Sequence, residues 1–156
     1  MERCKRIYEH PLFQESLARI DGAEKERIFC LHGLPHALDT ARIGYIMILE
    51  QGLNIDKELF YAAALLHDSG RYNPVLDDHA EASAINAALI LPECGFSDAE
   101  TAEVVAAIRS HRHGESSSDF GEILYLADKK SRMCFDCKAQ SLCYWADEKR
   151  NMEVEI

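Results

Sequence analysis

An apolar run of seven residues, Phe60-Tyr-Ala-Ala-Ala-Leu-Leu66, ends directly in His67 and Asp68. If the run is a buried helix, an imidazole and a carboxylate lie together at its end. Burying both groups costs free energy unless they have a partner. A divalent metal is a suitable partner, because His nitrogen and Asp oxygen both bind such ions. The fold must therefore bring further ligands to the end of this helix.

The rest of the chain also predicts helices. No stretch alternates apolar and polar residues for long enough to indicate a strand. Pro11 should kink or restart the first helix, Asp21-Gly22 should break it, and Gly52 and Pro92 should mark the ends of later ones. We expect an all-α fold, a compact bundle of about six to seven helices, with helical segments near residues 3–20, 23–30, 36–51, 56–66, 78–91, 97–112 and 118–132.

Length and composition limit the class of protein. A chain of 156 residues suits a single domain, which we assign to 1–156 with a cysteine-rich tail at 133–156. There is no apolar run of about 20 residues that could span a bilayer, and the N-terminus has no apolar stretch of the kind a signal peptide needs. We therefore expect a cytoplasmic protein without a membrane partner. The net charge of −10 argues against nonspecific nucleic acid binding.

Other candidate ligands fall near the ends of the predicted helices. His36 opens one helix, His79 lies in the first turn of another, and His111 lies in the last turn of a third. Asp128 ends the apolar stretch that begins at Leu124, so its carboxylate also needs a partner. Antiparallel helices joined by short loops can bring such ends together, as in the metal sites of helical bundles.

Some histidines could have a role other than metal binding. His32 precedes His36 by four residues, but the glycine and proline between them work against a shared helix face. We therefore expect His32 to be structural, or to contact a metal ligand without binding the metal itself. His79 could be an ordinary surface residue, and His111 could be a cation at a helix C-terminus, with His113 competing for its role.

The order His, His-Asp, Asp resembles the HD superfamily of metal-dependent phosphohydrolases, over roughly Leu31 to Arg132. Five segments carry the resemblance: His36-Ala-Leu-Asp-Thr-Ala-Arg-Ile, Leu65-Leu-His-Asp-Ser-Gly-Arg71, His79-Ala-Glu-Ala-Ser83, Ala107-Ile-Arg-Ser-His111 and Leu126-Ala-Asp-Lys-Lys130. The resemblance implies an HD-type helical domain. It also implies a first metal held by His36, His67, Asp68 and Asp128, and an Asp68 bridge to a second metal held by His79 and His111.

The nature of the metal stays open. Mixed His and carboxylate ligands suit one or two ions of iron, manganese, cobalt, nickel or zinc. Such ions can lower the pKa of a bound water to about 7 and so provide a nucleophile at neutral pH. Among nearby cations, Arg71 and Lys129 are the preferred phosphate-binding groups, and with Asp68 they form the predicted catalytic set. Arg109, Arg112 and Lys130 are further candidates, and each could instead be a solvated side chain.

Three cysteines, Cys134, Cys137 and Cys143, lie close together in the tail. A C-x2-C pair with a third cysteine can hold zinc or an iron–sulfur cluster, although the spacing matches no standard zinc finger. Cys30, Cys94 or a histidine would have to complete the site. The alternative is a set of reduced thiols in a segment that aromatic residues pin onto the core, namely Phe135, Tyr144 and Trp145.

The predicted function is hydrolysis of a phosphomonoester or phosphoanhydride of a nucleotide or related small metabolite by a metal-activated water. In so short a chain, selectivity should come from loops such as 72–78 and 114–118. Two alternatives remain: a di-iron oxygenase on the same fold, and a non-catalytic metal-binding regulatory module. The substrate, the number of ions and the oligomeric state stay open.

Overall fold

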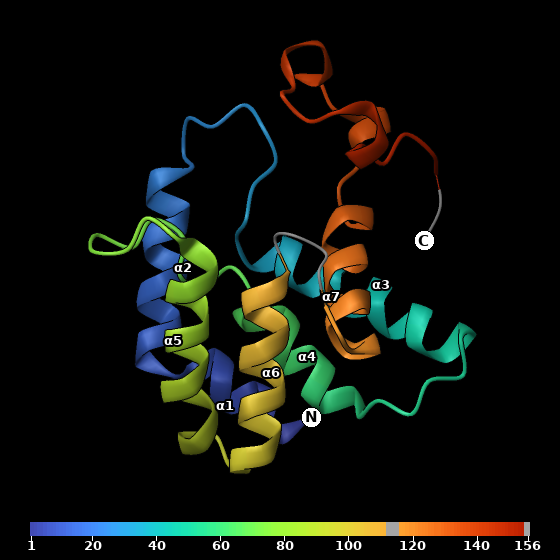
Figure 1. The fold of residues 1–156 in the computed structure, drawn as a ribbon. Helices are drawn as coiled ribbons and strands as arrows, with labels where there is room; N and C mark the ends of the chain where they lie inside the picture. Colours follow the sequence, from blue (N-terminus) through green and yellow to red (C-terminus); the bar gives the residue numbers. More distant parts are fainter. Residues whose placement is uncertain (112–115, 155–156) are drawn as a thin grey trace.

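The computed structural model describes residues 1–111 and 116–154, and these residues form α-helices, short 3₁₀ turns and loops. The elements are α1 (Glu2–Glu9), α2 (Pro11–Ala23), α3 (Leu34–Glu50), α4 (Lys57–Leu66), α5 (His79–Glu93), α6 (Asp98–Ser110) and α7 (Asp119–Lys130), followed by η1 (Cys134–Asp136), η2 (Gln140–Leu142) and η3 (Asp147–Lys149). The expected all-α fold is confirmed (Figure 1). In the described ranges, no helix is both long and apolar enough to cross a membrane.

Helix α4 lies at the centre of the molecule and packs against α1, α3, α5, α6 and α7 (Figure 1). It carries the apolar run of the sequence, and Phe60 and Leu66 are completely buried. Burying side chains of this size contributes roughly 1.5–3 kcal/mol each. Helix α3 lies so close that a Cβ at Gly44 would stand 2.3 Å from the Phe60 ring. The helix that ends in His67 and Asp68 is thus held from all sides.

Side chains cap the N-termini of α4, α5, α6 and α7. The carboxylates of Asp56 and Asp78 and the hydroxyls of Ser97 and Ser118 accept hydrogen bonds from backbone N–H groups of α4, α5, α6 and α7. Ser97 forms a capping box with Glu100. At the other end of α3, Gly52 adopts a positive φ of 65°, which glycine allows at low cost.

The predicted break at Asp21-Gly22 and the helix at 23–30 are wrong. Helix α2 continues to Ala23, and a turn and irregular chain follow up to residue 33. An added Cβ at Gly22 would meet nothing within 4 Å, so the glycine costs α2 only about 1 kcal/mol. Glu24 leaves the helical path because its carboxylate is buried and accepts a hydrogen bond from the backbone N–H of His32.

Three predicted helix ends also differ. Pro92 lies inside the last turn of α5, which ends at Glu93, because the N–H of Cys94 still closes the turn on the carbonyls of Ile90 and Leu91. Helices α6 and α7 end at Ser110 and Lys130, two residues earlier than expected. The consequence for α7 is that Arg132 lies beyond the helix, where its side chain turns into the interior.

Candidate metal centre

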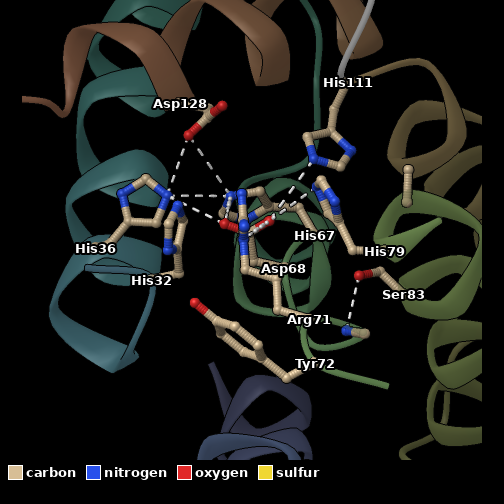
Figure 2. A network of polar contacts seen from close by, with 12 residues as sticks. His32, His36, His67, Asp68, Arg71, Tyr72, His79, Ser83, His111 and Asp128 are labelled. Atoms are coloured by element: carbon tan, nitrogen blue, oxygen red, sulfur yellow. Dashed lines mark hydrogen bonds and ion pairs between the residues drawn. The ribbon is translucent and has the colours of Figure 1, made fainter. Parts of the chain in front are cut away.

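The ends of five helices bring all six predicted ligands together (Figure 2). The start of α3 and α5, the residues that follow α4 and α6, and the last turn of α7 supply them: His36, His79, His67 with Asp68, His111 and Asp128. Five of the six are buried, and the side chain of His79 is 16% exposed.

Three of the side chains form a first group, His36, His67 and Asp128, whose ligand atoms all lie within 4.8 Å of one another. Nε2 of His36 lies 3.2 Å from Nε2 of His67 and 3.1 Å from Oδ1 of Asp128. The other three form a second group of the same kind, Asp68, His79 and His111. Each group offers two nitrogens and one carboxylate oxygen, a donor set that suits a divalent transition metal.

Asp68 lies between the two groups (Figure 2). Its Oδ2 is 3.3 Å from Nε2 of His67 and 3.6 Å from Nε2 of His36. Its Oδ1 is 3.5 Å from Nε2 of His79 and 3.8 Å from Nε2 of His111. A carboxylate placed in this way has one oxygen for each group, which is the arrangement that a bridge between two ions requires. The roles of the six residues as metal ligands stay predictions.

The tautomers of three histidines fit metal binding. Their Nδ1 atoms face oxygen acceptors outside the groups: the carbonyls of Ala64 for His67 (2.7 Å) and of Ile108 for His111 (2.5 Å), and Oγ of Ser131 for His36 (3.0 Å). A carbonyl can only accept, and Ser131 donates its own proton to the carbonyl of Asp128. Nδ1 therefore carries a proton in each of the three, which leaves Nε2, on the side of the site, as the atom that a metal would bind.

A protonated His67 and neighbouring cations offset the charges of the two carboxylates when no metal is bound. Burial alone would raise the pKa values of Asp68 and Asp128, but the neighbouring histidines and cations hold both well below the usual range. Burial alone would lower the pKa of His67, but the same carboxylates outweigh it and raise that pKa to about 9. Burial lowers the pKa of His36 to about 4. A divalent ion would replace the proton on His67 as the positive charge between two carboxylates.

One atom indicates directly that the site fits a cation. Oδ1 of Asp68 is buried and accepts no hydrogen bond from the described residues. Nε of Arg71 lies 2.9 Å from it as an ion-pair partner, but its N–H is not directed along a hydrogen bond. A desolvated carboxylate oxygen without a hydrogen bond is costly, and a metal held with His79 and His111 would remove that cost.

A cavity of about 550 Å³ opens beside the groups. Arg71 and Lys129 line it, as expected of phosphate-binding groups. Lys129 also pairs with the carboxylate of Asp128. Arg109 is not part of the lining, because it makes a bidentate ion pair with Glu81 on the surface. The candidates Arg112 and His113 and most of the loop 114–118 lie outside the described residues.

Sequence reasoning missed Arg132. Its Nη2 lies 2.8 Å from Nε2 of His36 and 3.2 Å from Oδ1 of Asp128, and its Nη1 donates to the carbonyl of Leu31. A cation bound between His36 and Asp128 would have to displace this guanidinium group toward the cavity. The spacing of four residues after Asp128 was the signal available for it in the sequence.

Sequence reasoning also missed a hydrogen-bonded cluster next to His36, formed by His32, Glu24 and Tyr72. The ring of His32 lies edge-on to that of His36, with 5.9 Å between centroids, and its Nδ1 bonds to the buried carboxylate of Glu24 at 2.5 Å. The hydroxyl of Tyr72 donates to the same carboxylate at 3.0 Å. Tyr72 adopts a positive φ of 56°, a conformation that a tyrosine rarely adopts, so this hydrogen bond holds a strained residue of the 72–78 loop. Nothing in the sequence around Glu24 indicates this partnership.

Known proteins resemble the chain over this region. The family model named HD domain matches residues 33–133, a range that includes all six candidate ligands. A protein of Clostridium beijerinckii, named only as uncharacterized, is 35% identical over 156 residues and is matched over 99% of both chains. The crystal structure of a predicted HD superfamily hydrolase from an uncultured Thermotogales bacterium is similar with a TM-score of 0.62 and 30% identity, over 91% of this chain and 83% of that one.

Proposed function

The chain belongs to the HD domain family, and on that premise we propose that it is a metal-dependent phosphohydrolase acting on a small phosphorylated molecule. The proposal goes beyond the hydrolase name of the similar Thermotogales protein, because that name states no substrate. It rests on the charge of the cavity beside the six candidate ligands.

The cavity is cationic in an acidic protein. The whole chain has a net charge of −10. The only carboxylate in the described lining is Asp128, whereas six lining residues are cationic: Arg27, Arg71, Lys129, Arg132, Lys149 and Arg150. Concentrating positive charge around buried carboxylates and imidazoles suits an anion that contacts both the bound cations and the guanidinium groups. This contrast is the observation that favours a phosphorylated substrate.

Individual residues then have distinct tasks. A bound divalent metal would supply Lewis-acid activation of water and of a phosphoryl oxygen. His36, His67, Asp68 and Asp128, together with His79 and His111, would hold one or two such ions. Arg71 and Lys129 each pair with one of the two central carboxylates, so they lie where they could also bind the phosphoryl oxygens. The metal could be iron, manganese, cobalt, nickel or zinc, because the donor set accepts them all.

The aromatic residues that line the cavity favour a nucleotide among phosphorylated metabolites. Phe29, Tyr144 and Trp145 line it and offer aromatic faces on which a base could stack. Nζ of Lys129 lies 5.3 Å from the Trp145 ring centroid, so the aromatic wall is adjacent to the predicted phosphate site. The cavity volume of about 550 Å³ is within the usual range for small-molecule sites.

The test is phosphate release from nucleoside mono-, di- and triphosphates and from simple phosphomonoesters. Protein purified without chelator would be compared with protein reconstituted with each of the five metals. We expect turnover that Asp68→Asn abolishes and that Asp39→Asn leaves unchanged, because Asp39 on α3 pairs with the exposed Arg42 and is not among the candidate ligands. An Asp68→Asn variant as active as wild type, or no phosphate release with any metal and substrate, would contradict the proposal.

The same assay separates the two alternatives. A di-iron oxygenase uses the same kind of ligands, so it would release no phosphate but would consume oxygen when loaded with ferrous iron. A regulatory metal-binding module would do neither and would still lose metal in Asp68→Asn. The cationic cavity is the reason to prefer the phosphohydrolase.

A further inference from the structure

Four of the six cysteines line the cavity. Cys134, Cys137 and Cys143 come from the tail, and Cys30 comes from the irregular segment between α2 and α3, far away in the sequence. The two segments touch where the rings of Phe29 and Tyr144 make an edge contact at 5.9 Å. Burial raises the pKa of the Cys134 thiol, and the nearby thiols of Cys30, Cys143 and Cys137 each raise it further, so Cys134 lies near the other three.

Hydrogen bonds to the backbone hold each of these cysteines in position. The carbonyls of Cys30, Cys134 and Cys143 accept from the side chains of Arg27 (2.9 Å), Gln140 (2.8 Å) and Arg150 (3.1 Å), and the carbonyl of Cys137 accepts from the N–H of Gln140 (3.1 Å). All four thiols are free of disulfides. The other two cysteines, Cys4 and Cys94, are buried among the helices and do not line the cavity.

The tail has little else to hold it in a single conformation. Beyond α7 it forms only the short turns η1, η2 and η3. Its large apolar side chains Leu142 and Tyr144 are 66% and 75% exposed, and its buried apolar residues are Cys134 and Ala139. So small a buried surface cannot offset the conformational entropy lost by more than twenty ordered residues. A cross-link at the point where the cysteines converge would supply the missing stabilisation.

The spacing of the sulfurs indicates which cross-link fits. Zinc holds thiolates at about 2.3 Å in a tetrahedron, so their sulfurs lie within about 4 Å of one another. In the described part of the chain, no three of these sulfurs lie within 4.8 Å of one another, whereas both groups of the metal centre meet that limit. A cube of four irons and four sulfides binds one thiolate at each iron and holds the thiolates farther apart than a single ion does.

We propose that Cys30, Cys134, Cys137 and Cys143 ligate a 4Fe–4S cluster, separate from the metal centre, which fastens the tail over the cavity. The cluster joins the C-terminal wall to the segment before α3. Arg150 binds the carbonyls of both Cys143 and Trp145, so the aromatic and cationic groups of that wall are attached directly to a cluster ligand. The cluster thus positions the residues that close the cavity. This inference does not depend on the reaction at the metal centre.

Acid-labile sulfide is the measurement that distinguishes the cluster from iron in the metal centre, because only the cluster contains it. We expect about four sulfides per chain in protein purified without oxygen, with the broad visible absorption of a 4Fe–4S cluster. The variants Cys30→Ser and Cys137→Ser should lose the sulfide, and Cys94→Ser should keep it. The variant His36→Ala/Asp128→Ala, in which the metal centre is disrupted, should also keep it.

Circular dichroism shows whether a cysteine variant has kept its fold, because the cluster ligands lie outside α1 to α7. Cys30→Ser with wild-type helix content and no sulfide supports the proposal. Stoichiometric zinc without sulfide would overturn it, as would a disulfide among the four thiols in protein alkylated under anaerobic conditions. Equal loss of sulfide in Cys94→Ser and Cys30→Ser would also overturn it.

Discussion

At the scale of single residues, the two oxygens of Asp68 have different environments. Oδ2 faces His36 and His67, and Oδ1 faces His79 and His111. The residue can do this because it follows the end of α4, where the chain turns sharply and Gly70 passes against α5. Nε2 of its neighbour His67 faces Asp128 as well as Oδ2 of Asp68, and Nδ1 of His67 is fixed by the Ala64 carbonyl. One adjacent pair therefore serves two groups of ligands.

Arg71 and Lys129 should bind the phosphoryl group of the substrate. We expect Arg71→Gln and Lys129→Met each to lower kcat/KM by about 10- to 100-fold, the usual effect of losing a hydrogen bond to a charged group. The control is Arg109→Gln, which removes an exposed ion pair with Glu81 and should leave kcat/KM unchanged. Steady-state kinetics on the substrate found in the screen makes the measurement. Equal effects in all three variants would contradict the assignment.

At the scale of elements, close contacts between helices position the ligands. A Cβ at Gly70 would stand 2.2 Å from the backbone nitrogen of Ser83, whose hydroxyl also accepts a hydrogen bond from the Gly70 N–H. This contact joins the turn after α4 to α5, which carries His79. The geometry of the second group of ligands therefore depends on one glycine outside it.

Gly70→Ala should lower the free energy of unfolding by about 1–3 kcal/mol, because the backbone of α5 would have to move. Gly22→Ala is the matched control. A Cβ there meets nothing within 4 Å, so the same change inside α2 should raise stability by up to about 1 kcal/mol. Urea denaturation followed by circular dichroism gives both values. If both substitutions change the free energy of unfolding in the same direction, the packing argument is wrong.

A second contact between elements ties the N-terminus to the core. Arg3 on α1 donates to Glu58 near the start of α4 at 2.9 Å and to Glu100 near the start of α6 at 2.8 Å. Hydrogen bonds from Ser97 and from Arg3 lower the pKa of Glu100 to about 2. Since the pKa of an unfolded glutamate is about 4.3, Glu100 contributes stability above that pH.

This contribution should be lost as the pH falls from about 5 to about 2, because the folded pKa lies below the unfolded one. Arg3→Met should therefore reduce the difference in unfolding free energy between pH 7 and pH 3. Arg19→Met removes a comparable exposed pair with Glu15 within α2 and should leave that difference unchanged. Denaturant titrations at both pH values make the comparison. If the free energy of unfolding of Arg3→Met changed between pH 7 and pH 3 by as much as that of wild type, the Arg3–Glu100 pair would not be the source of this pH dependence.

At the scale of the whole molecule, the candidate ligands join α3, α4, α5, α6 and α7, so bound metal should stabilise the fold. A ligand at 100 times its Kd stabilises by about 2.7 kcal/mol, and each kcal/mol raises Tm by about 2–4 °C in a protein of this size. Chelation should therefore lower Tm by roughly 5–10 °C, and added metal should restore it. In Asp68→Asn this dependence should be much smaller, whereas Asp39→Asn should behave as wild type.

The sequence by itself determined most of the helices, though not the chain at 23–30, and the identities of the candidate ligands. Asp56 and Ser97 act through neighbouring backbone groups, and the apolar run before His67 could only be buried, so local chemistry was sufficient. The tertiary structure decided the contacts between residues that are far apart in the sequence. In the folded protein, Glu24 leaves the helical path and binds His32, the side chain of Arg132 lies in the candidate metal site, and Cys30 lies near Cys134 of the tail. Such contacts depend on how helices pack, which no local pattern encodes.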